Sequence, residues 1–380
     1  MILPPPILAS TLEILAKRNI PKITYLLRSG RRERLAEPGQ GPTEFFYGYQ
    51  QLLARGVDVS ILEDFDVGMA PPLPLVSRLA NKLSPFLGGL PVGMTLSLLT
   101  KRGCRKLDGA GCVVATTNGM GMALAIAKAL GQTDMPVLLL AMGLLPMNPT
   151  PVQIRLVSAL ARHIHIACIS RSEQAFLQRL LPGKLIHYVP FGVDQNFWKP
   201  VDSPKGDYVL AVGNDKNRDW PTLVAAWREG FPPLKIITNL PVPAGTTNVQ
   251  IVRGDWRNQL IGDKELRALV QGARFVVIPL GDTIQPAGQS ACLQAMSCGK
   301  AVILSDTVGL WDRDLIRSGT SALLVPPGDV TSLSDSIQKL TCDLILVEQL
   351  GIAARRVVEE SLNAGIMAES LRCLVDVIFD

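Results

Sequence analysis

The sequence of 380 residues lacks the features that define several classes of protein. It has no run of about 18 apolar residues, so a membrane-spanning helix is not expected. Its seven cysteines form no CxxC pair, and their odd number argues against structural disulfides and against a zinc site. Residues 1–15 are apolar but have neither a basic lead-in nor a small-residue cleavage site, so we expect no signal peptide. These absences favour a reducing, cytoplasmic compartment.

Histidine is also scarce. The chain has only three histidines, His163, His165 and His187, and none precedes His163. His163 and His165 alternate as residues of a β-strand do, which fits the edge of a sheet better than a metal site. The sequence therefore predicts neither a bound metal ion nor another cofactor.

Acidic residues are missing from one long segment. The net charge is +5, but residues 67–107 contain no Asp or Glu at all. The segment mixes apolar residues with six basic ones, and residues 28–34 hold a second basic cluster. Both suit an anionic membrane surface or an acidic acceptor, although a solvated rim around ordinary helices would look the same. The basic residues are Arg78, Lys82, Lys101, Arg102, Arg105 and Lys106, with Arg28, Arg31, Arg32 and Arg34 in the second cluster.

What the sequence does contain is enough apolar material for two domains. Hydrophobic residues make up 47% and charged residues 19%, which is a globular composition. Strand-like and helix-like segments alternate along the chain, an order typical of parallel sheets covered by helices. The expected strands are 23–28, 57–62, 111–116, 136–141, 164–170, 208–212, 234–238, 249–252, 275–279, 301–305 and 322–325. The expected helices are 43–55, 121–130, 150–162, 172–181, 220–227, 264–272, 289–297, 330–341, 344–362 and 364–379.

A break in this alternation divides the chain. Residues 190–206 are rich in Pro and Gly and have little periodicity, as expected of a linker. We therefore expect a first domain over residues 1–190, a linker over 191–206 and a second domain over 207–355. The predicted fold class is α/β, with two Rossmann-like domains facing a cleft.

The segment 275–300 combines the features of a phosphate-binding turn. A buried strand leads into a loop with Pro286 and Gly288, and the loop opens directly into a helix. The first N–H groups of a helix have no internal partner and carry partial positive charge, so a diphosphate would bind there. Gly288 would let the backbone approach the phosphate, and the amides of Gln289 and Ser290 would donate to it. An ordinary strand–turn–helix connection that binds nothing is the alternative.

The surrounding blocks resemble a known family. LQAMSCGKAVIL from residue 293, VGLWDRDLI from residue 308, GTSALLVPPGD from residue 319 and VPFGVDQNFWKP from residue 189 occur in a familiar order and spacing. The chain is similar to the retaining glycosyltransferases of family 4, the group 1 glycosyl transferases of GT-B fold. The resemblance covers residues 165–340, while the first half resembles the family in architecture only. It implies that residues 356–380 return to the first domain.

The resemblance also assigns a donor site, with one departure. Many members carry two acidic residues around the donor sugar and ribose; here Pro286 and Gln294 stand at these positions. Gln294 is a weaker, neutral acceptor for a ribose hydroxyl. Donor recognition would then depend on the loop and the start of the helix. The implied donor-binding residues are Gly213, Asn214, Pro286, Ala287, Gly288, Gln289, Ser290 and Gln294.

A second block, residues 211–226, corresponds to the family segment whose Arg and Lys neutralise the leaving diphosphate. Asn214 stands near the Arg position and Arg218 at the Lys position, with Gly213 and Lys216 close by. A guanidinium can form two parallel hydrogen bonds to phosphate oxygens, so Arg218, assisted by Lys216, is the catalytic candidate. A simple ion pair of Arg218 with a neighbouring Asp is the alternative.

In the first half, Gly41, Thr43 and Glu44 lie where the family has a glycine-rich loop near the acceptor. A plain helix start with Pro in its first turn fits the same residues. The histidine that many members place over the donor sugar is absent, which a retaining front-face mechanism tolerates because it needs no separate base.

The resulting hypothesis is sugar transfer from a nucleotide diphosphate sugar to a hydroxyl acceptor, with retention and without metal, in glycan biosynthesis. A lipid-linked acceptor and peripheral contact with the inner face of an anionic membrane would account for the acid-free segment; no nucleic-acid partner is expected. Two other functions stay open. One is a non-catalytic relative that binds nucleotide or glycan, which the missing acidic pair favours. The other is a sugar-nucleotide epimerase.

Overall fold

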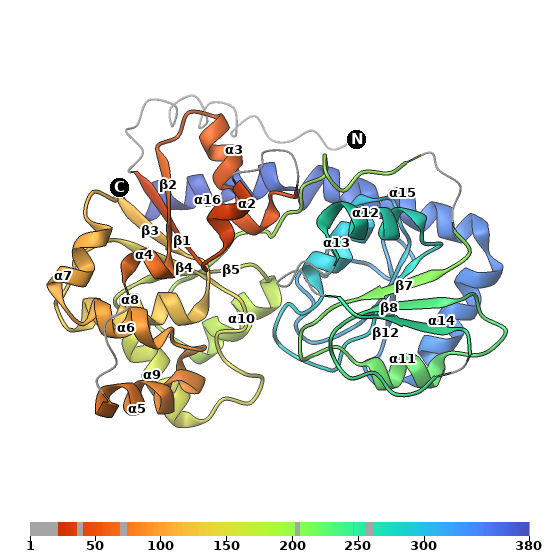
Figure 1. The fold of residues 1–380 in the computed structure, drawn as a ribbon, viewed down its shortest axis with the longest axis horizontal. Helices are drawn as coiled ribbons and strands as arrows, with labels where there is room; N and C mark the ends of the chain where they lie inside the picture. Colours follow the sequence, from red (N-terminus) through yellow and green to blue (C-terminus); the bar gives the residue numbers. More distant parts are fainter. Residues whose placement is uncertain are drawn as a thin grey trace.

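The computed structural model describes residues 22–35, 41–68, 74–201, 206–245, 247–254 and 261–379. They form two lobes, each built on a parallel six-stranded sheet (Figure 1). The strand order is β2-β1-β3-β4-β5-β6 in the first lobe and β12-β11-β10-β7-β8-β9 in the second. In each sheet the order reverses beside the strand that comes first in the lobe, which is the topology of doubly wound nucleotide-binding folds. The two-domain α/β prediction is confirmed.

The first sheet is buried on both faces. Its central strands read CVVA and VLLLA and are fully buried, as parallel strands covered by helices must be. The sixth strand, β6, was not anticipated from the sequence, because three residues are too few to show a period. The strands are β1 (Ile23–Leu27), β2 (Val59–Glu63), β3 (Cys112–Ala115), β4 (Val137–Ala141), β5 (His165–Cys168) and β6 (Ile186–Tyr188).

Three capped helices cover this sheet: α8 (Asn118–Ala129), α9 (Pro151–Ala161) and α10 (Arg171–Leu180). The side chains of Thr117, Thr150 and Ser170 accept a hydrogen bond from the first turn of their helices. The third helix begins at Arg171, one residue before the predicted start at Ser172, and its cap is Ser170.

The helix expected over residues 43–55 is broken in two. A single 3₁₀ turn, η1 (Glu44–Phe46), precedes α3 (Tyr49–Ala54). Between them Tyr47 and Gly48 both adopt left-handed backbone angles, with φ of 51° and 86°. Left-handed residues cannot continue a right-handed helix, so the prediction of one helix was wrong.

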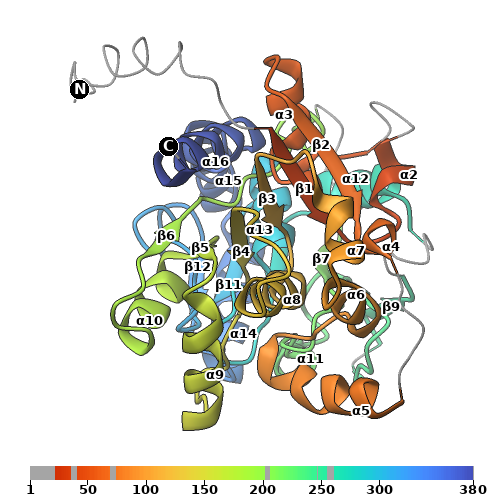
Figure 2. The ribbon, with the colours of Figure 1, turned by 90° about the vertical axis from the view of Figure 1, so that its left-hand side faces the viewer.

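The acid-free segment folds into short helices at one end of the first lobe, which Figure 2 views from the front. The helix α6 packs on α8, and α5 and α7 each contact α6. The elements of this segment are α5 (Pro74–Leu83), η2 (Ser84–Leu87), α6 (Val92–Leu98), α7 (Lys101–Cys104) and η3 (Arg105–Leu107). The short helix α4 (Asp64–Val67) leads into the segment, and α2 (Arg31–Leu35) follows β1.

The second lobe matches its predicted elements closely. Its strands are β7 (Val209–Val212), β8 (Leu234–Ile237), β9 (Val249–Val252), β10 (Val276–Ile278), β11 (Val302–Ser305) and β12 (Leu323–Val325). Its helices are α11 (Trp220–Ala226), α12 (Asp263–Gly272), α13 (Gln289–Ser297), α14 (Val330–Cys342) and α15 (Leu344–Ser361).

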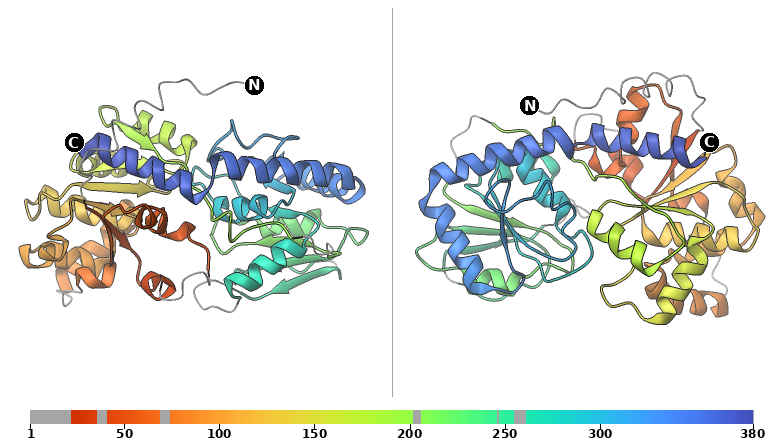
Figure 3. Two further views of the ribbon diagram at one scale, coloured as in Figure 1. Left: turned by 90° about the horizontal axis from the view of Figure 1, so that it is seen from above. Right: turned by 180° about the vertical axis from the view of Figure 1, so that it is seen from behind.

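The chain crosses between the lobes twice. The segment after β6 leads into the second lobe, and α16 (Ala364–Phe379) returns from α15 to the first, where it packs against α3. Figure 3 shows α15 and α16 running along one side of both lobes. The two crossings pair at Val193 and Asn363, and an ion pair of 2.6 Å joins Arg55 to Glu369 of α16.

Two expectations concern membranes and secretion. Within the part of the chain that the structure describes, none of the helices has the length and apolar character needed to cross a bilayer. Residues 1–15, which the sequence predicts to lack a signal peptide, lie outside the described residues.

Candidate functional site

The candidate site lies where the strand order of the second sheet reverses, at the carboxyl ends of β7 and β10. Open α/β sheets bind their ligands at such a point. The loop after β10 leads into α13, whose N-cap residue Gly288 has φ of 71° and gives the helix no side-chain cap. The N–H of Gln289 donates to the carbonyl of Pro286 at 3.4 Å, and no side chain caps the N–H groups that follow it. This end of the helix is therefore suitable for an anion.

Arg218, from the loop after β7, lies directly beside this helix start. Its side chain is only 3% exposed. A Cβ atom at Gly213 would lie 2.5 Å from Arg218 Nη2, and one at Gly288 would lie 3.1 Å from Nη1. The two glycines thus leave just enough space for the guanidinium, one from each loop.

Charge is only partly compensated at Arg218. Its Nε atom forms an ion pair of 2.8 Å with Asp215, so the simple ion pair considered from the sequence does form. Among the described residues, nothing hydrogen-bonds to the buried Nη1 atom. Burial lowers the pKa of Arg218 and outweighs the raising effect of Asp215. A buried guanidinium with an unused donor favours an anionic ligand at this point.

The other predicted residues of the first loop differ from Arg218. Asn214 accepts hydrogen bonds from Thr238 Oγ1 at 3.2 Å and from the backbone N–H of Asn239 at 2.6 Å. It also donates to the carbonyl of Gly254 at 2.9 Å, so its amide holds three loops together. Lys216 is exposed at the rim of the loop.

The start of α13 also meets the first lobe. Gln289 is buried, and its Nε2 atom donates to the carbonyl of Ile169 at 3.3 Å, while Oε1 is buried without a partner among the described residues. Pro286, Ala287 and Ser290 are half-buried around it. The loop and helix start therefore lie at the junction of the lobes, as the donor hypothesis requires.

Gln294, in contrast, is buried away from solvent and is engaged by the first lobe. Its Nε2 atom donates to Glu44 Oε1 at 2.9 Å. Glu44 is fully buried and also accepts from Trp198 Nε1 at 2.8 Å and from the backbone N–H of Asp194 at 3.2 Å. The expectation that Gln294 offers its amide to a ribose, and that Glu44 lines the acceptor side, does not fit this conformation.

The remaining acceptor-side residues join the same junction. The backbone N–H of Thr43 donates to Asp194 Oδ2 at 3.2 Å, and its Oγ1 accepts from Gln51 at 2.8 Å. A Cβ atom at Gly41 would lie 2.9 Å from Asp263 Oδ2, so this glycine permits close approach of the second lobe. The loop is held against the linker and α12.

Burial dominates the electrostatics of two carboxyl groups at the junction. It raises the pKa of Glu44 from 4.5 to about 7, although the side-chain hydrogen bonds from Gln294 and Trp198 lower it. It also raises the pKa of Glu173, whose Oε1 accepts from the backbone N–H of Leu144 at 2.9 Å. Both carboxyls lie deep in the protein, where the charged form is costly.

Sequence reasoning missed a polar pair at the same junction. Gln285 from the loop after β10 accepts a hydrogen bond from Asn217 Nδ2 at 3.0 Å and lies against Gly143 of the first lobe. In the sequence, Gln285 adjoins Pro286 and Asn217 adjoins Arg218, so the two polar residues next to predicted site residues could have been noticed. The contact with Gly143 was not visible, because it joins residues far apart in the sequence.

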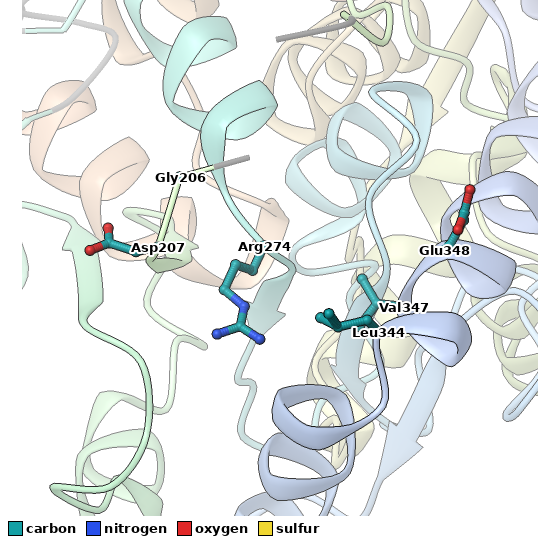
Figure 4. A pocket seen from close by; sticks show the side chains of 6 residues that line it. All are labelled: Gly206, Asp207, Arg274, Leu344, Val347 and Glu348. Carbon is teal, nitrogen blue, oxygen red and sulfur yellow. The ribbon is translucent and has the colours of Figure 1, made fainter. Parts of the chain in front are cut away.

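Among the described residues, no group of three or more His, Cys, Asp or Glu side chains is placed to hold a metal ion. A pocket of about 390 Å³ opens at the opposite, amino-terminal edge of the second sheet (Figure 4). Its position away from the carboxyl ends of the strands separates it from the candidate site. Its lining residues are Gly206, Asp207, Arg274, Leu344, Val347 and Glu348.

The sequence matches one family in part. Residues 247–343 match the family described as "Glycosyl transferases group 1". This range includes the loop after β10 and the whole of α13. A comparison with curated proteins gives no match.

Solved structures match over nearly the whole chain. Sucrose-phosphate synthase from Thermosynechococcus elongatus is 18% identical with a TM-score of 0.68, covering 94% of this chain and 98% of its own. HepE from Anabaena, solved in complex with UDP-glucose, is 14% identical with a TM-score of 0.64, covering 94% and 100%. A glycosyltransferase from Rickettsia africae is 13% identical with a TM-score of 0.63, covering 96% and 100%. At these identities the likeness concerns the GT-B fold.

Proposed function

Because the chain is a glycosyltransferase of GT-B fold whose residues 247–343 match the group 1 family, we propose that its donor is a nucleotide diphosphate sugar. The sugar passes to a hydroxyl group of an acceptor. Anabaena HepE, which shares the fold, has been solved with UDP and with UDP-glucose, and this supports a donor of the same class.

The observation that carries the proposal is the buried Arg218 beside the start of α13. Its Nη1 atom has no partner among the described residues and lies next to Gly288, where the backbone is free of a Cβ atom. In the proposed complex the diphosphate sits over Gly288, accepts from the first N–H groups of α13 and from Nη1, and leaves Asp215 on Nε. Lys216, at the exposed rim, assists through its charge.

These groups account for catalysis by stabilising the leaving group. As the bond between sugar and phosphate breaks, negative charge grows on the diphosphate, and the fixed guanidinium and helix dipole stabilise it. A preorganised donor of this kind contributes about 100- to 1,000-fold in rate. We propose that this cationic pocket takes the role that a metal ion has in other enzymes. We also propose transfer with retention, on the same face of the sugar.

Binding and turnover test the proposal separately. Saturation-transfer NMR with UDP-glucose and GDP-mannose should show binding of one donor, and Arg218→Ala should weaken it. Hydrolysis of that donor without acceptor, followed as released UDP or GDP, distinguishes an enzyme from a non-catalytic binding protein. If neither nucleotide sugar nor nucleotide binds to the wild-type protein, the proposal fails. If Arg218→Ala keeps full turnover, Arg218 has no part in the mechanism.

For the acceptor we propose a lipid-linked hydroxyl compound reached at an anionic membrane surface. The short helices at this end of the first lobe expose Arg78 and Lys82 of α5 and Arg102 of α7. Two apolar side chains of the same segment are also exposed, Leu79 to 58% and Phe86 to 36%. Basic and apolar side chains together favour an anionic bilayer. The second basic cluster adds less, because two of its residues are paired: Arg32 with Asp66 and Arg34 with Asp263.

Vesicle sedimentation tests this membrane contact. The protein should sediment with vesicles that contain phosphatidylglycerol and stay in solution with phosphatidylcholine alone. A Lys82→Glu, Arg102→Glu double variant should lose the difference, whereas the same reversal at Arg179 and Arg228, which lie outside the acid-free segment, should keep it. Equal behaviour of the wild-type protein with both vesicle types would contradict the contact.

A further inference from the structure

Gln285 connects the two lobes close to the start of α13, the proposed site of the diphosphate. Its side chain leaves the loop after β10 and lies against the backbone of Gly143 in the first lobe. A Cβ atom at Gly143 would lie 2.7 Å from both Cδ and Nε2 of Gln285. Gly143 also has φ of 70°, which only glycine adopts readily. The position of Gln285 thus depends on a glycine across the junction.

A second amide holds Gln285 from its own lobe. Asn217 Nδ2 donates to Gln285 Oε1 at 3.0 Å. The two loops that carry these residues are also paired through their backbones. The N–H of Gly281 donates to the carbonyl of Asn217 at 2.9 Å, and Arg218 and Leu280 form an isolated antiparallel β-bridge. Asn217 adjoins Arg218 in sequence. The amide pair is therefore fixed beside the pocket proposed for the diphosphate.

The surface of the first lobe opposite Gln285 is equally fixed. Asn118 donates to the carbonyl of Met142 at 2.9 Å and accepts from the N–H of Met142 at 3.1 Å. The next N–H groups are held by the buried Glu173, which accepts from Leu144 at 2.9 Å. The loop that contains Gly143 is thus held by side-chain hydrogen bonds on both sides, and Gln285 packs against this fixed backbone.

Gln285 immediately precedes Pro286. In the family that the sequence resembles, the position of Pro286 is occupied by an acidic residue near the donor sugar. A carboxamide offers both a donor and an acceptor, as sugar hydroxyls require, and it does so without a charge. Gln285, held by Asn217 within the second lobe, faces the first lobe at Gly143 in the same loop that leads to Gly288. A sugar that extends from a diphosphate over Gly288 toward the junction of the lobes would meet this amide. We propose that Gln285, oriented by Asn217, is a specificity-determining residue that hydrogen-bonds to the transferred sugar.

This inference rests on the proposed function, and its test separates the two. Nucleotide and nucleotide-sugar affinities are measured by calorimetry, with UDP and GDP in one arm and UDP-glucose and GDP-mannose in the other. Gln285→Ala should bind the nucleotide as the wild-type protein does but should lose about tenfold in affinity for the nucleotide sugar. Gln250→Ala, the same change on the exposed edge strand β9, serves as the matched control and should alter neither.

The other outcomes are equally decisive. If Gln285→Ala binds both ligands like the wild-type protein, Gln285 does not contact the sugar. If both affinities fall together, Gln285 merely supports the phosphate pocket or the junction, and the inference is overturned while the proposed function stands. If the wild-type protein binds no nucleotide at all, the proposed function fails first.

A double-mutant cycle with Gly143 tests the contact itself. Gly143→Ala should lower nucleotide-sugar affinity by more than tenfold, since its methyl group would displace the Gln285 side chain. In the Gln285→Ala background that side chain is gone, so the additional effect of Gly143→Ala should shrink to the strain of the left-handed backbone. Equal effects of Gly143→Ala in both backgrounds would show that the two residues act independently and would overturn the proposal.

Discussion

Gln294 Nε2 donates to Glu44 Oε1 at 2.9 Å, across 250 residues of sequence and between the two lobes. In the family that the sequence resembles, the position of Gln294 is occupied by an acidic residue. Here the carboxyl group at this place belongs to Glu44 of the first lobe instead. Glu44 also binds Trp198 of the connecting segment. One buried carboxyl thus joins the first lobe, the linker and α13, the helix that begins at the candidate phosphate site.

Restoring the acid at position 294 should therefore destabilise the protein. Gln294→Glu would place two carboxyl groups within hydrogen-bonding distance in a buried site, at a cost of about 3 kcal/mol in the free energy of unfolding at pH 8. Urea denaturation followed by tryptophan fluorescence measures this cost. The exchanged pair, Glu44→Gln with Gln294→Glu, retains one acid and one amide and should recover most of the loss. If the exchange recovers nothing, the pair is not the reason for the instability.

The raised pKa of Glu44 predicts a pH dependence of stability. The native carboxyl titrates near 7 and the unfolded one near 4.5, so between these values the native state binds more protons than the unfolded state. The contribution of Glu44 to the free energy of unfolding is therefore fully present below about pH 4.5. It is lost as the pH rises to about 7, and the loss amounts to roughly 3 kcal/mol.

The Glu44→Gln variant isolates this contribution. Glu173 has a raised pKa as well and acts in the same direction, so the wild-type slope alone is not diagnostic. Urea denaturation between pH 5 and pH 8 should show a smaller fall for Glu44→Gln than for the wild-type protein, because a glutamine cannot ionise. Parallel curves for the two proteins would contradict the assignment of the shifted group to Glu44.

The geometry at Arg218 predicts that a lysine cannot replace it. The ammonium of a lysine is a point charge and cannot keep the ion pair with Asp215 while directing a second donor at the phosphate. Arg218→Lys should lower kcat/KM for the nucleotide sugar by about 100-fold. Arg228→Lys, the same change at an exposed position of the second lobe, is the control and should leave kcat/KM unchanged. A fully active Arg218→Lys enzyme would mean that charge alone matters.

How far the sequence could predict these features depended on whether they were local. The strand and helix that flank Gly288 were predicted to within a residue or two, because buried β-branched runs and a glycine before a helix are local signals. The break at Tyr47 was missed, since a non-glycine residue in the left-handed region leaves no mark in an apolar pattern. The roles of Gln294 and Gln285 could not be predicted, because the contacts of Gln294 with Glu44 and of Gln285 with Gly143 each join residues from different lobes.

Gly288 offers the last and most local prediction, since its φ of 71° is strained for alanine and its surroundings are full. A Cβ atom there would lie 2.7 Å from Ile278 Cγ2 and 3.1 Å from Arg218 Nη1.

Gly328 has nearly the same backbone angle, φ of 75°, but nothing within 4 Å of its Cβ position. Gly328→Ala should therefore cost only the backbone strain, about 1–2 kcal/mol, and leave nucleotide binding intact. Gly288→Ala should cost about 1–3 kcal/mol more, because the methyl group overpacks the site, and it should weaken UDP or GDP binding by displacing Arg218. Thermal unfolding and calorimetry on the two variants measure both effects. Equal losses of stability with unchanged nucleotide affinity would mean that Gly288 serves the turn alone and that no ligand approaches it.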